Sequence, residues 1–443
     1  DLEPPSPQQP IAQLAHGLDR VLFNPGVSWL QDPRSNVYNY TTWLENVPSV
    51  KDFAFERLGG FISSSRDQDL WSLARSEKRT FAGSTSSLSG LLSHIYFLIS
   101  GDKRVNTTSL SRHFQYEPTN FTPGQRMPAS VVLKHSDGVY AIDSLSLIPG
   151  SSEKNVLTWM GTVLEKFLTM PKEQFSRLLR SSPDPTEEPE SKREAYRYSK
   201  SDKFVMRSQL DCYDSRLPGT GVFDIKTRAA VPIRLDLMNY EENSGYIIRT
   251  LQGPLESFEK EYYDLIRSAF LKYSFQARIG NMDGVLVAYH NTARIFGFQY
   301  VPLSEMDSCI FGSEGRGDRV FEKCVQMMEA IMTEAVHQFP DQSIRCVTEK
   351  KEGSDVLQVF LEPADWNEET QGPTPIVQLD VTVVNYAGDT EVRGSTAVAR
   401  SDLPWTILYS ISIPSLSLRE IRGNLSEVIS RQFFAYNLPS GVS

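Results

Sequence analysis

Carboxylate, amide and basic side chains recur between Phe204 and Arg228, in the sequence FVMRSQLDCYDSRLPGTGVFDIKTR. Two β-prone runs flank a turn rich in Asp, Pro and Gly, and this pattern predicts a strand–turn–strand hairpin. Because side chains alternate between the two faces of a strand, Asp224 and Lys226 share one face of the second strand. The first strand has a polar face of its own, which carries Arg207, Gln209 and Asp211.

The polar faces of this hairpin allow two interpretations. One is an ordinary hairpin whose polar side faces water. The other is a central strand covered on both sides, which the β-rich and helical sequence after Arg228 favours. Carboxylates and a lysine on a covered strand are costly unless they form ion pairs or bind a metal ion. The second interpretation therefore predicts a chemical site at Asp211, Asp224 and Lys226.

The spacing of these residues is similar to a known motif. Asp211, twelve intervening residues and then Asp224-Ile225-Lys226-Thr227 resemble the active-site signature of the PD-(D/E)XK nuclease superfamily, in its RecB-like DxKT form. Together with three further segments, this stretch resembles the fungal mitochondrial RNA-processing and turnover family of the petite series, over nearly the whole chain. The segments that carry the likeness are residues 32–39, 83–87, 207–228 and 275–291.

The resemblance implies a fold, an activity and a metal. The fold is α+β, with an α/β PD-(D/E)XK core of a mixed sheet flanked by helices and with N- and C-terminal extensions. The activity is that of an exoribonuclease working from the 5′ to the 3′ end, with Mg²⁺ or Mn²⁺ as cofactor. The implied metal ligands are Asp211, Asp224, the backbone carbonyl of Ile225 and Glu165, and Lys226 orients the attacking water.

The same family pattern suggests contacts to the substrate. Two interpretations remain open for Arg207, Gln209 and Arg228, which either bind the scissile phosphate or neutralise the carboxylates. RecB-like exonucleases carry Gln-x-x-x-Tyr on the next helix, whereas this chain has Glu259-x-x-x-Tyr263. The expected substrate-binding residues of this region are Arg207, Gln209, Thr227, Arg228, Gln276 and Arg278.

A serine-rich loop precedes the apolar run from Leu88 to Ile99. The simpler interpretation is a helix whose N-terminus is capped by a hydroxyl group. The alternative is that Ser84, Ser86 and the helix N-terminus bind the 5′ phosphate of RNA through hydroxyl and N–H groups. The sequence leaves both open.

Four regions are expected along the chain. Residues 1–10 are rich in Pro and Gln, which predicts disorder, and residues 11–128 form a mainly helical region. Residues 129–300 form the nuclease core, with a charged insertion at 181–200, and residues 301–443 form an α+β extension. Within the core, apolar spacing predicts a helix over 152–170. Glu165 lies off the apolar stripe of this helix. It therefore either faces solvent or supports the metal.

Composition limits the other possibilities. The 443 residues carry 45 basic and 55 acidic side chains, and a net charge of −10 disfavours a protein that coats nucleic acid. Four cysteines without CxxC spacing favour a reduced compartment and no structural zinc. No apolar run reaches 18 residues, so no transmembrane helix is predicted. The start at Asp1 without Met favours a trimmed or mature form.

Three functions compete at this point. The leading one is a metal-dependent exoribonuclease of the mitochondrial matrix that processes and degrades RNA from its single-stranded 5′ end. The second is a non-catalytic RNA-processing scaffold or adaptor with a nuclease-like fold, and the third is a DNA nuclease. The resemblance also suggests mitochondrial RNA polymerase or the RNA-degradation machinery as partners. It leaves peripheral association with the inner membrane open.

Overall fold

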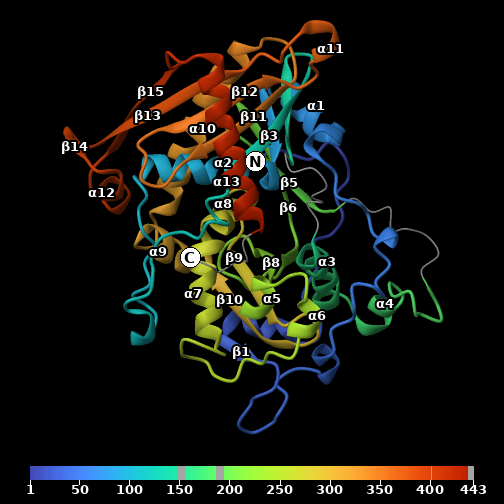
Figure 1. Cartoon of the computed structure of the whole chain (residues 1–443). Coiled ribbons are helices and arrows are strands. Elements are labelled where there is room, and N and C mark those ends of the chain that lie inside the picture. The colour runs from blue at the N-terminus through green and yellow to red at the C-terminus, as the bar shows by residue number, and fades with distance from the viewer. Residues whose placement is uncertain (147–154, 186–193, 401, 438–443) are drawn as a thin grey trace.

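The computed structural model describes residues 1–146, 155–185, 194–400 and 402–437. These residues form an α+β fold in which two mixed sheets are flanked by helices, and this confirms the predicted fold class (Figure 1). One sheet has ten strands and the other has five. No helix in the described part of the chain is long and apolar enough to cross a membrane.

The smaller sheet carries the predicted DxK strand as an interior strand. Its strand order is β1-β10-β9-β8-β7, and β8 runs parallel to β9 while the other neighbours are antiparallel. Because β8 has neighbours on both edges, the prediction of a central strand is confirmed. The five strands are β1 (Val27–Trp29), β7 (Cys212–Tyr213), β8 (Val222–Ala229), β9 (Gly284–His290) and β10 (Ile295–Pro302).

The larger sheet has the order β14-β13-β12-β11-β3-β4-β2-β6-β5, with β15 also paired to β13. It takes strands from all three regions expected after residue 10; the boundaries of those regions stay a prediction. The ten strands are β2 (Phe81–Ser84), β3 (Ala129–Ser136), β4 (Val139–Ser144), β5 (Tyr196–Lys200), β6 (Phe204–Gln209), β11 (Ile344–Lys350), β12 (Leu357–Pro363), β13 (Val377–Ala387), β14 (Thr390–Val392) and β15 (Trp405–Ser412).

The predicted hairpin over 204–228 is only partly correct. β6 pairs with β2 and β5 in the larger sheet, whereas β7 pairs with β8 through two residue pairs. Between Gln209 and Cys212 the chain passes from one sheet to the other. The backbone N–H of Leu210 still bonds to Ala195 beside β5, but the carboxylate of Asp211 already accepts a hydrogen bond from the N–H of Ile225 in β8. Asp211 therefore lies where the two sheets meet.

The helices around this junction are mostly those that the apolar spacing predicts. α3 (Val156–Thr169) is capped by Asn155, and its predicted start at 152–154 lies outside the described residues, as do 186–193 of the charged insertion. The helix expected to carry Glu259 and Tyr263 is α7 (Phe258–Ser268), and a second helix, α8 (Phe270–Gly280), follows it directly. Ala269 separates them because its φ of −141° is not helical.

The remaining long helices pack on the two sheets and on other helices. α2 (Thr85–Ile99) is apolar on nearly all sides and lies buried in the main core, as expected for a helix enclosed by other elements. The others are α1 (Gln68–Ser76), α9 (Leu303–Phe311), α10 (Gly317–Gln338) and α13 (Leu418–Asn437). The short ones are α4 (Lys172–Ser176), α5 (Val231–Leu235), α6 (Tyr240–Asn243), α11 (Glu368–Gln371) and α12 (Gly394–Ala399).

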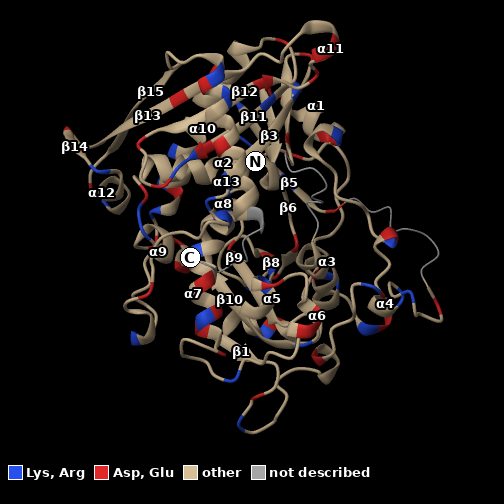
Figure 2. Cartoon of the chain, in the orientation of Figure 1, with Lys and Arg blue, Asp and Glu red and all other residues tan. Residues whose placement is uncertain are grey.

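A second apolar core positions α3 over the smaller sheet. Phe167 of α3, Phe223 and Ile225 of β8 and Leu286 of β9 belong to one buried cluster. Because side chains alternate along β8, this packing turns Asp224 and Lys226 toward the opposite face. Basic and acidic residues are interspersed along the ribbon (Figure 2), so the charged residues of the site are not part of a long block of one sign.

Candidate active site

A cavity of about 350 Å³ lies where the two sheets meet, between α3, β8, α8 and the start of α2. It brings together eight of the residues predicted from the sequence. These are Glu165, Gln209, Asp211, Asp224, Ile225, Lys226, Thr227 and Gln276. The described residues that complete the wall are Thr85, Thr158, Gly161, Thr162, Ser208, Tyr273 and Met282.

Asp224 and Lys226 form the centre of this cavity. They lie two residues apart on β8, and the Lys226 Nζ is 2.5 Å from the Asp224 Oδ2. Burial acts to lower the pKa of Lys226, but the carboxylates of Asp224 and Asp211 outweigh it, and the pKa is raised. The ring of Tyr273 lies 5.2 Å from the Lys226 Nζ and offers a cation–π contact. Lys226 is therefore a charged group held in one place.

The pKa values of Asp211 and Asp224 shift in opposite directions, which favours one proton shared by the two carboxyl groups. Burial and the negative charge of Asp224 raise the pKa of Asp211 well above its ordinary value. Burial also acts to raise the pKa of Asp224, but Lys226 and a hydrogen bond from Asp211 outweigh it, and that pKa is lowered. Two carboxyl groups this close do not both ionise without a cation between them. The raised pKa of Asp211 and the lowered pKa of Asp224 therefore favour the proton on Asp211 and the negative charge on Asp224.

Glu165 reaches the cavity from α3. It lies on the helix face that carries Thr158 and Thr162, and its side chain is 21% exposed, so it does not project into open solvent. The Lys166 Nζ is 3.2 Å from the Glu165 Oε1 and 3.4 Å from a Glu194 carboxylate oxygen. Burial raises the pKa of Glu165 in spite of Lys166. A smaller cavity of about 170 Å³ continues on the other side of Glu165 and Asp211.

α8 provides a wall that the sequence pattern revealed only in part. Gln276, an expected substrate contact, lines the cavity, and its Oε1 is buried without a hydrogen-bond partner among the described residues. Tyr273 has the spacing of a packing residue in the sequence but faces the cavity. On α3, the spacing of Thr158, Thr162 and Glu165 marks a polar stripe opposite the apolar one, and this signal could have identified the wall.

Three arginines expected at the site are not brought to the cavity. Arg207 is buried and donates to the Asp67 Oδ2 at 2.7 Å and to the Ile62 carbonyl at 2.6 Å. Arg228 donates to the Ser268 Oγ at 3.3 Å, and burial together with Arg234 lowers its pKa to about 10. Arg278 pairs with acidic residues beside a different cavity. Their guanidinium groups therefore have structural partners.

The serine loop contains a helix cap and also approaches the cavity. Ser84 and Ser87 form a reciprocal capping box, with the Ser84 N–H donating to the Ser87 Oγ at 3.1 Å. Ser86 is exposed, and its hydroxyl lies 2.9 Å from that of Ser84. Neither Ser84 nor Ser86 lines the cavity, but Thr85, the first residue of α2, does. The N-terminus of α2 therefore begins at the edge of the site.

The oxygen donors suit a hard divalent cation in part. No group of three or more His, Cys, Asp or Glu side chains in the described chain is arranged to hold a metal ion. Asp211 and Asp224 nevertheless present two carboxylates that share a single proton, and Gln276 has an orphaned amide oxygen nearby. Oxygen ligands of this kind are those that Mg²⁺ and Mn²⁺ prefer. Among the described acidic residues of the cavity, only the carboxylates of Asp211 and Asp224 are available to such a cation, since Glu165 already forms an ion pair with Lys166.

Sequence comparisons identify relatives of this chain. The family model described as "Mitochondrial protein Pet127" matches residues 61–333. A relative from Schizosaccharomyces pombe, "mRNA degradation protein pet127, mitochondrial", is 40% identical over 363 residues, which cover 81% of this chain and 69% of that protein. A second, from Saccharomyces cerevisiae, is named "Putative mitochondrial translation system component PET127". It is 40% identical over 321 residues, which cover 68% of this chain and 38% of that protein.

Solved structures show weaker similarity. Scheffersomyces stipitis Rai1 in complex with (3'-NADP)+ and calcium ion has a TM-score of 0.40 and 10% sequence identity, over 76% of this chain and 83% of that one. Candida albicans Rai1 in complex with pU5-Mn2+ has a TM-score of 0.37 and 9% identity, over 69% of this chain and 81% of that one.

Proposed function

This chain belongs to the Pet127 family of mitochondrial proteins, and we propose that it is a metal-dependent exoribonuclease of the mitochondrial matrix that acts at RNA 5′ ends. The names of the two curated relatives, one for mRNA degradation and one for translation, support a role with mitochondrial RNA. The observation that carries the nuclease proposal is the Asp211–Asp224 pair beside Lys226. The 5′-to-3′ polarity rests on the resemblance of the sequence to the PD-(D/E)XK and petite families.

Each residue of the cavity has a proposed task in phosphodiester hydrolysis. Asp211, Asp224 and the carbonyl of Ile225 would hold a divalent cation such as Mg²⁺ or Mn²⁺, with Glu165 as a supporting acid. When bound, such a cation polarises a phosphoryl oxygen and lowers the pKa of a bound water. Lys226, fixed by Asp224 and Tyr273, orients the attacking water and stabilises the charge that develops on the phosphate.

The walls of the cavity supply the contacts to the rest of the substrate. Gln209, Thr227 and Gln276 offer amide and hydroxyl groups, and the unpartnered oxygen of Gln276 leaves its amide free to turn toward a ligand. α3 and α8 enclose the site from two sides, which favours a single strand over a duplex. The N-terminus of α2 offers N–H groups and the positive end of a helix dipole to a terminal phosphate.

A non-catalytic RNA-binding factor is the second candidate. Two ion pairs favour it, because Lys226 pairs with Asp224 and Lys166 with Glu165, so that two proposed catalytic acids already have basic partners. Association with the mitochondrial RNA polymerase, with the degradation machinery or with the inner membrane stays a prediction under either candidate. So does the DNA-nuclease alternative.

One assay separates these candidates. Single-stranded RNA and DNA carrying a 5′ phosphate, a 5′ hydroxyl or a 5′ triphosphate are incubated with the purified chain in Mg²⁺, Mn²⁺ or EDTA. We expect metal-dependent release of nucleotides from 5′-phosphorylated RNA. Binding of RNA without cleavage in either metal would favour the non-catalytic factor, and faster cleavage of DNA than of RNA would favour the DNA nuclease.

A further inference from the structure

A second and larger cavity, of about 910 Å³, lies next to the proposed active site. Met282 lines both cavities, and on α8 Gln276 borders the active cavity while Ala277 and Arg278 border the larger one. The two spaces therefore share Met282 as a common wall residue. An extended substrate with one phosphate in the active cavity has the larger cavity within reach of its neighbouring nucleotide.

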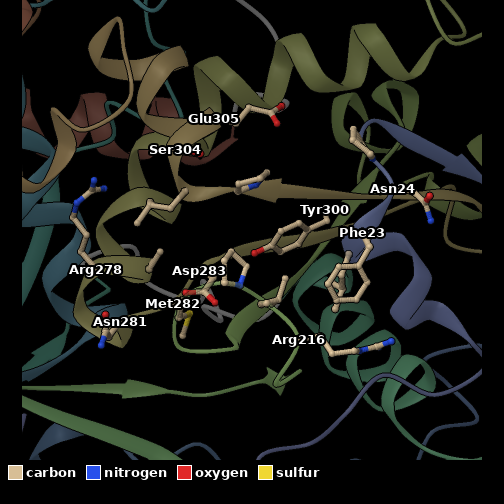
Figure 3. A pocket seen from close by; sticks show the side chains of 18 of the residues that line it. Phe23, Asn24, Arg216, Arg278, Asn281, Met282, Asp283, Tyr300, Ser304 and Glu305 are labelled. Atoms are coloured by element: carbon tan, nitrogen blue, oxygen red, sulfur yellow. The ribbon is translucent and has the colours of Figure 1, made fainter.

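The wall of this cavity comes from segments far apart in the sequence (Figure 3). Phe23 ends the first 3₁₀ helix (Leu18–Phe23) and Asn24 follows it, Arg216 lies in the turn before β8, and Tyr300 lies near the end of β10. Met282 and Asp283 connect α8 to β9. In Figure 3 the phenol of Tyr300 crosses the middle of the cavity and its oxygen points toward Asp283, with Phe23 and Arg216 at one end.

Every charged group in this wall already has a partner. Arg216 pairs at 2.6 Å with both Asp214 and Asp19, and Arg278 pairs with Asp307 at 2.6 Å and with Asp318 at 2.9 Å. Asp283 accepts hydrogen bonds from the N–H groups of Thr220 and Gly221, and Glu305 accepts one from the Tyr262 hydroxyl. A phosphate would have to displace these partners. The cavity therefore suits the uncharged part of a ligand.

The groups that remain available are aromatic or neutral and polar. Tyr300 is only 9% exposed, yet its hydroxyl makes no hydrogen bond to another described residue. Phe23 is 43% exposed, with the Arg216 guanidinium carbon 4.8 Å from its ring centroid on one side. The side-chain amide of Asn281 also lines the cavity without a hydrogen-bond partner among the described residues. Ring surface, a hydroxyl and an amide together match a heteroaromatic base with its sugar.

We propose that this cavity binds a nucleobase and its ribose from the single-stranded RNA whose adjoining phosphate occupies the active cavity. The base stacks on the exposed face of Phe23, the Asn281 amide bonds to the edge of the base, and the Tyr300 hydroxyl bonds to the base or the ribose. The proposal rests on the proposed function for the class of ligand. It adds a subsite that holds the substrate through a base rather than through a phosphate.

The test uses a 5′-phosphorylated oligoribonucleotide in which one abasic nucleotide replaces each position in turn. Binding to the purified chain is measured by fluorescence anisotropy in EDTA, so that cleavage does not interfere. For the wild type we expect one position, or two adjacent ones, at which loss of the base weakens binding about fivefold or more. We expect the Phe23→Ala variant to bind the intact RNA more weakly than the wild type does. Removing the base at the sensitive position of the RNA should then weaken binding to this variant no further.

Two further variants separate binding from folding. Tyr300→Phe removes one hydroxyl without a partner, so we expect an unchanged melting temperature and about threefold or more weaker RNA binding. Phe434→Ala is the matched control for Phe23→Ala, because Phe434 is 64% exposed on α13 and lines neither cavity. It should bind RNA as the wild type does.

The results distinguish failure of the subsite from failure of the proposed function. Cleavage of the intact oligonucleotide in Mg²⁺ is measured in parallel. A wild type that cleaves RNA but tolerates an abasic nucleotide at every position would overturn the subsite and leave the nuclease standing. A wild type that shows the abasic effect without any cleavage would retain the subsite and overturn the nuclease. Absence of both binding and cleavage would overturn both.

Discussion

One cluster of buried charge lies on β8 and a second lies beyond the C-terminal end of this strand, and the two differ in how the charge is balanced. In the first, Asp211 and Asp224 face a single base, Lys226, and share a proton. In the second, Arg234 of α5 bonds to both Glu261 and Asp264 of α7. We refer to the first as the acid site and to the second, which includes Lys260, as the Arg234 network.

The Arg234 network is complete without a ligand. The Asp264 Oδ2 lies 2.5 Å from an Arg234 Nη2, Lys260 approaches Asp264 at 2.9 Å, and Glu261 also accepts a hydrogen bond from the Val231 N–H at 3.0 Å. Each acid therefore has a base and further donors, and the network joins α5 to α7. The acid site has one carboxyl group too many for its base. This imbalance lies in a cavity, whereas the Arg234 network beyond the end of β8 is balanced, and the difference supports the proposal that a cation binds at the acid site.

The largest effect should come from breaking the Arg234 network. Arg234→Met leaves Glu261 and Asp264 buried without their shared base, which should cost about 3–5 kcal/mol of the free energy of unfolding. Urea denaturation followed by circular dichroism measures this loss. Lys51→Met is the control, because Lys51 pairs with Glu241 on the exposed surface and its loss should change stability far less. Equal costs for the two variants would contradict the structural role of the network.

Changes in the acid site should instead affect chemistry. Asp224→Asn and Lys226→Ala remove a proposed metal ligand and a charge stabiliser, and each should slow RNA cleavage about 100-fold or more. The fold should persist, because the cavity already contains an excess of acid. Initial rates in Mg²⁺ and circular dichroism spectra test both statements, with Lys51→Ala as the control for Lys226→Ala. A folded Asp224→Asn variant that cleaves RNA at the wild-type rate would contradict the assignment of Asp224 to the active site.

A contrast between local and distant interactions explains which site residues could be identified from the sequence. The grouping of Asp211, Asp224 and Lys226 was predictable because motif spacing and strand alternation are local, whereas the α+β class was predicted from the family resemblance. Arg207 and Arg228 have the same polar pattern, but their partners, Asp67 and Ser268, lie in other elements. Spacing along one strand contains no information about such distant partners. For the same reason the sequence pattern did not reveal that β6 and β8 belong to different sheets.

A smaller effect is expected from the shared proton itself. The raised pKa of Asp211 means that the folded, metal-free chain keeps a proton that the unfolded chain releases above the ordinary carboxyl pKa. The free energy of unfolding should therefore contain a contribution that is complete below that pH and is lost as the pH rises toward the raised pKa. Asp211→Asn removes this loss, so at neutral pH without metal the variant should melt about 1–3 °C above the wild type.

Metal should reverse the order of the two proteins. Mg²⁺ or Mn²⁺ bound between the carboxylates stabilises the wild type by about 1–3 kcal/mol at 10–100 times its Kd. Asp211→Asn should lose most of this response. Thermal melts from pH 4 to pH 9, with and without 5 mM metal, measure both quantities in one series. Two results together would contradict the shared-proton account. The melting temperature of the wild type would not change with metal, and it would equal that of Asp211→Asn at every pH.

The smallest effect should appear at the N-terminus of α2. The ligand proposed there is an anion, the 5′ phosphate of RNA, whereas the ligand proposed at the acid site is a cation. Thr85 brings the first turn of α2 to the cavity, and Ser84 and Ser87 already cap the helix. If the 5′ phosphate of RNA binds there, a carboxylate at the exposed Ser86 should repel it. Ser86→Asp should then reduce the preference for 5′-phosphate over 5′-hydroxyl RNA about two- to fivefold, while the neutral Ser86→Asn retains it.

The preference for a 5′-phosphate end, and not stability, separates this account from a purely structural helix cap. An acidic residue in the first turn of a helix interacts favourably with the helix dipole, so Ser86→Asp should melt no lower than the wild type. A cap without a ligand therefore predicts equal or higher stability and an unchanged end preference, whereas phosphate binding predicts the same stability with a weakened preference. Gly83→Val cannot serve here, since a Cβ at Gly83 would lie 2.8 Å from the Leu88 side chain and disturb the core. Measuring melting temperature and relative cleavage of the two RNAs on Ser86→Asp and Ser86→Asn decides whether α2 contributes only its packing to the site or also its N-terminal charge.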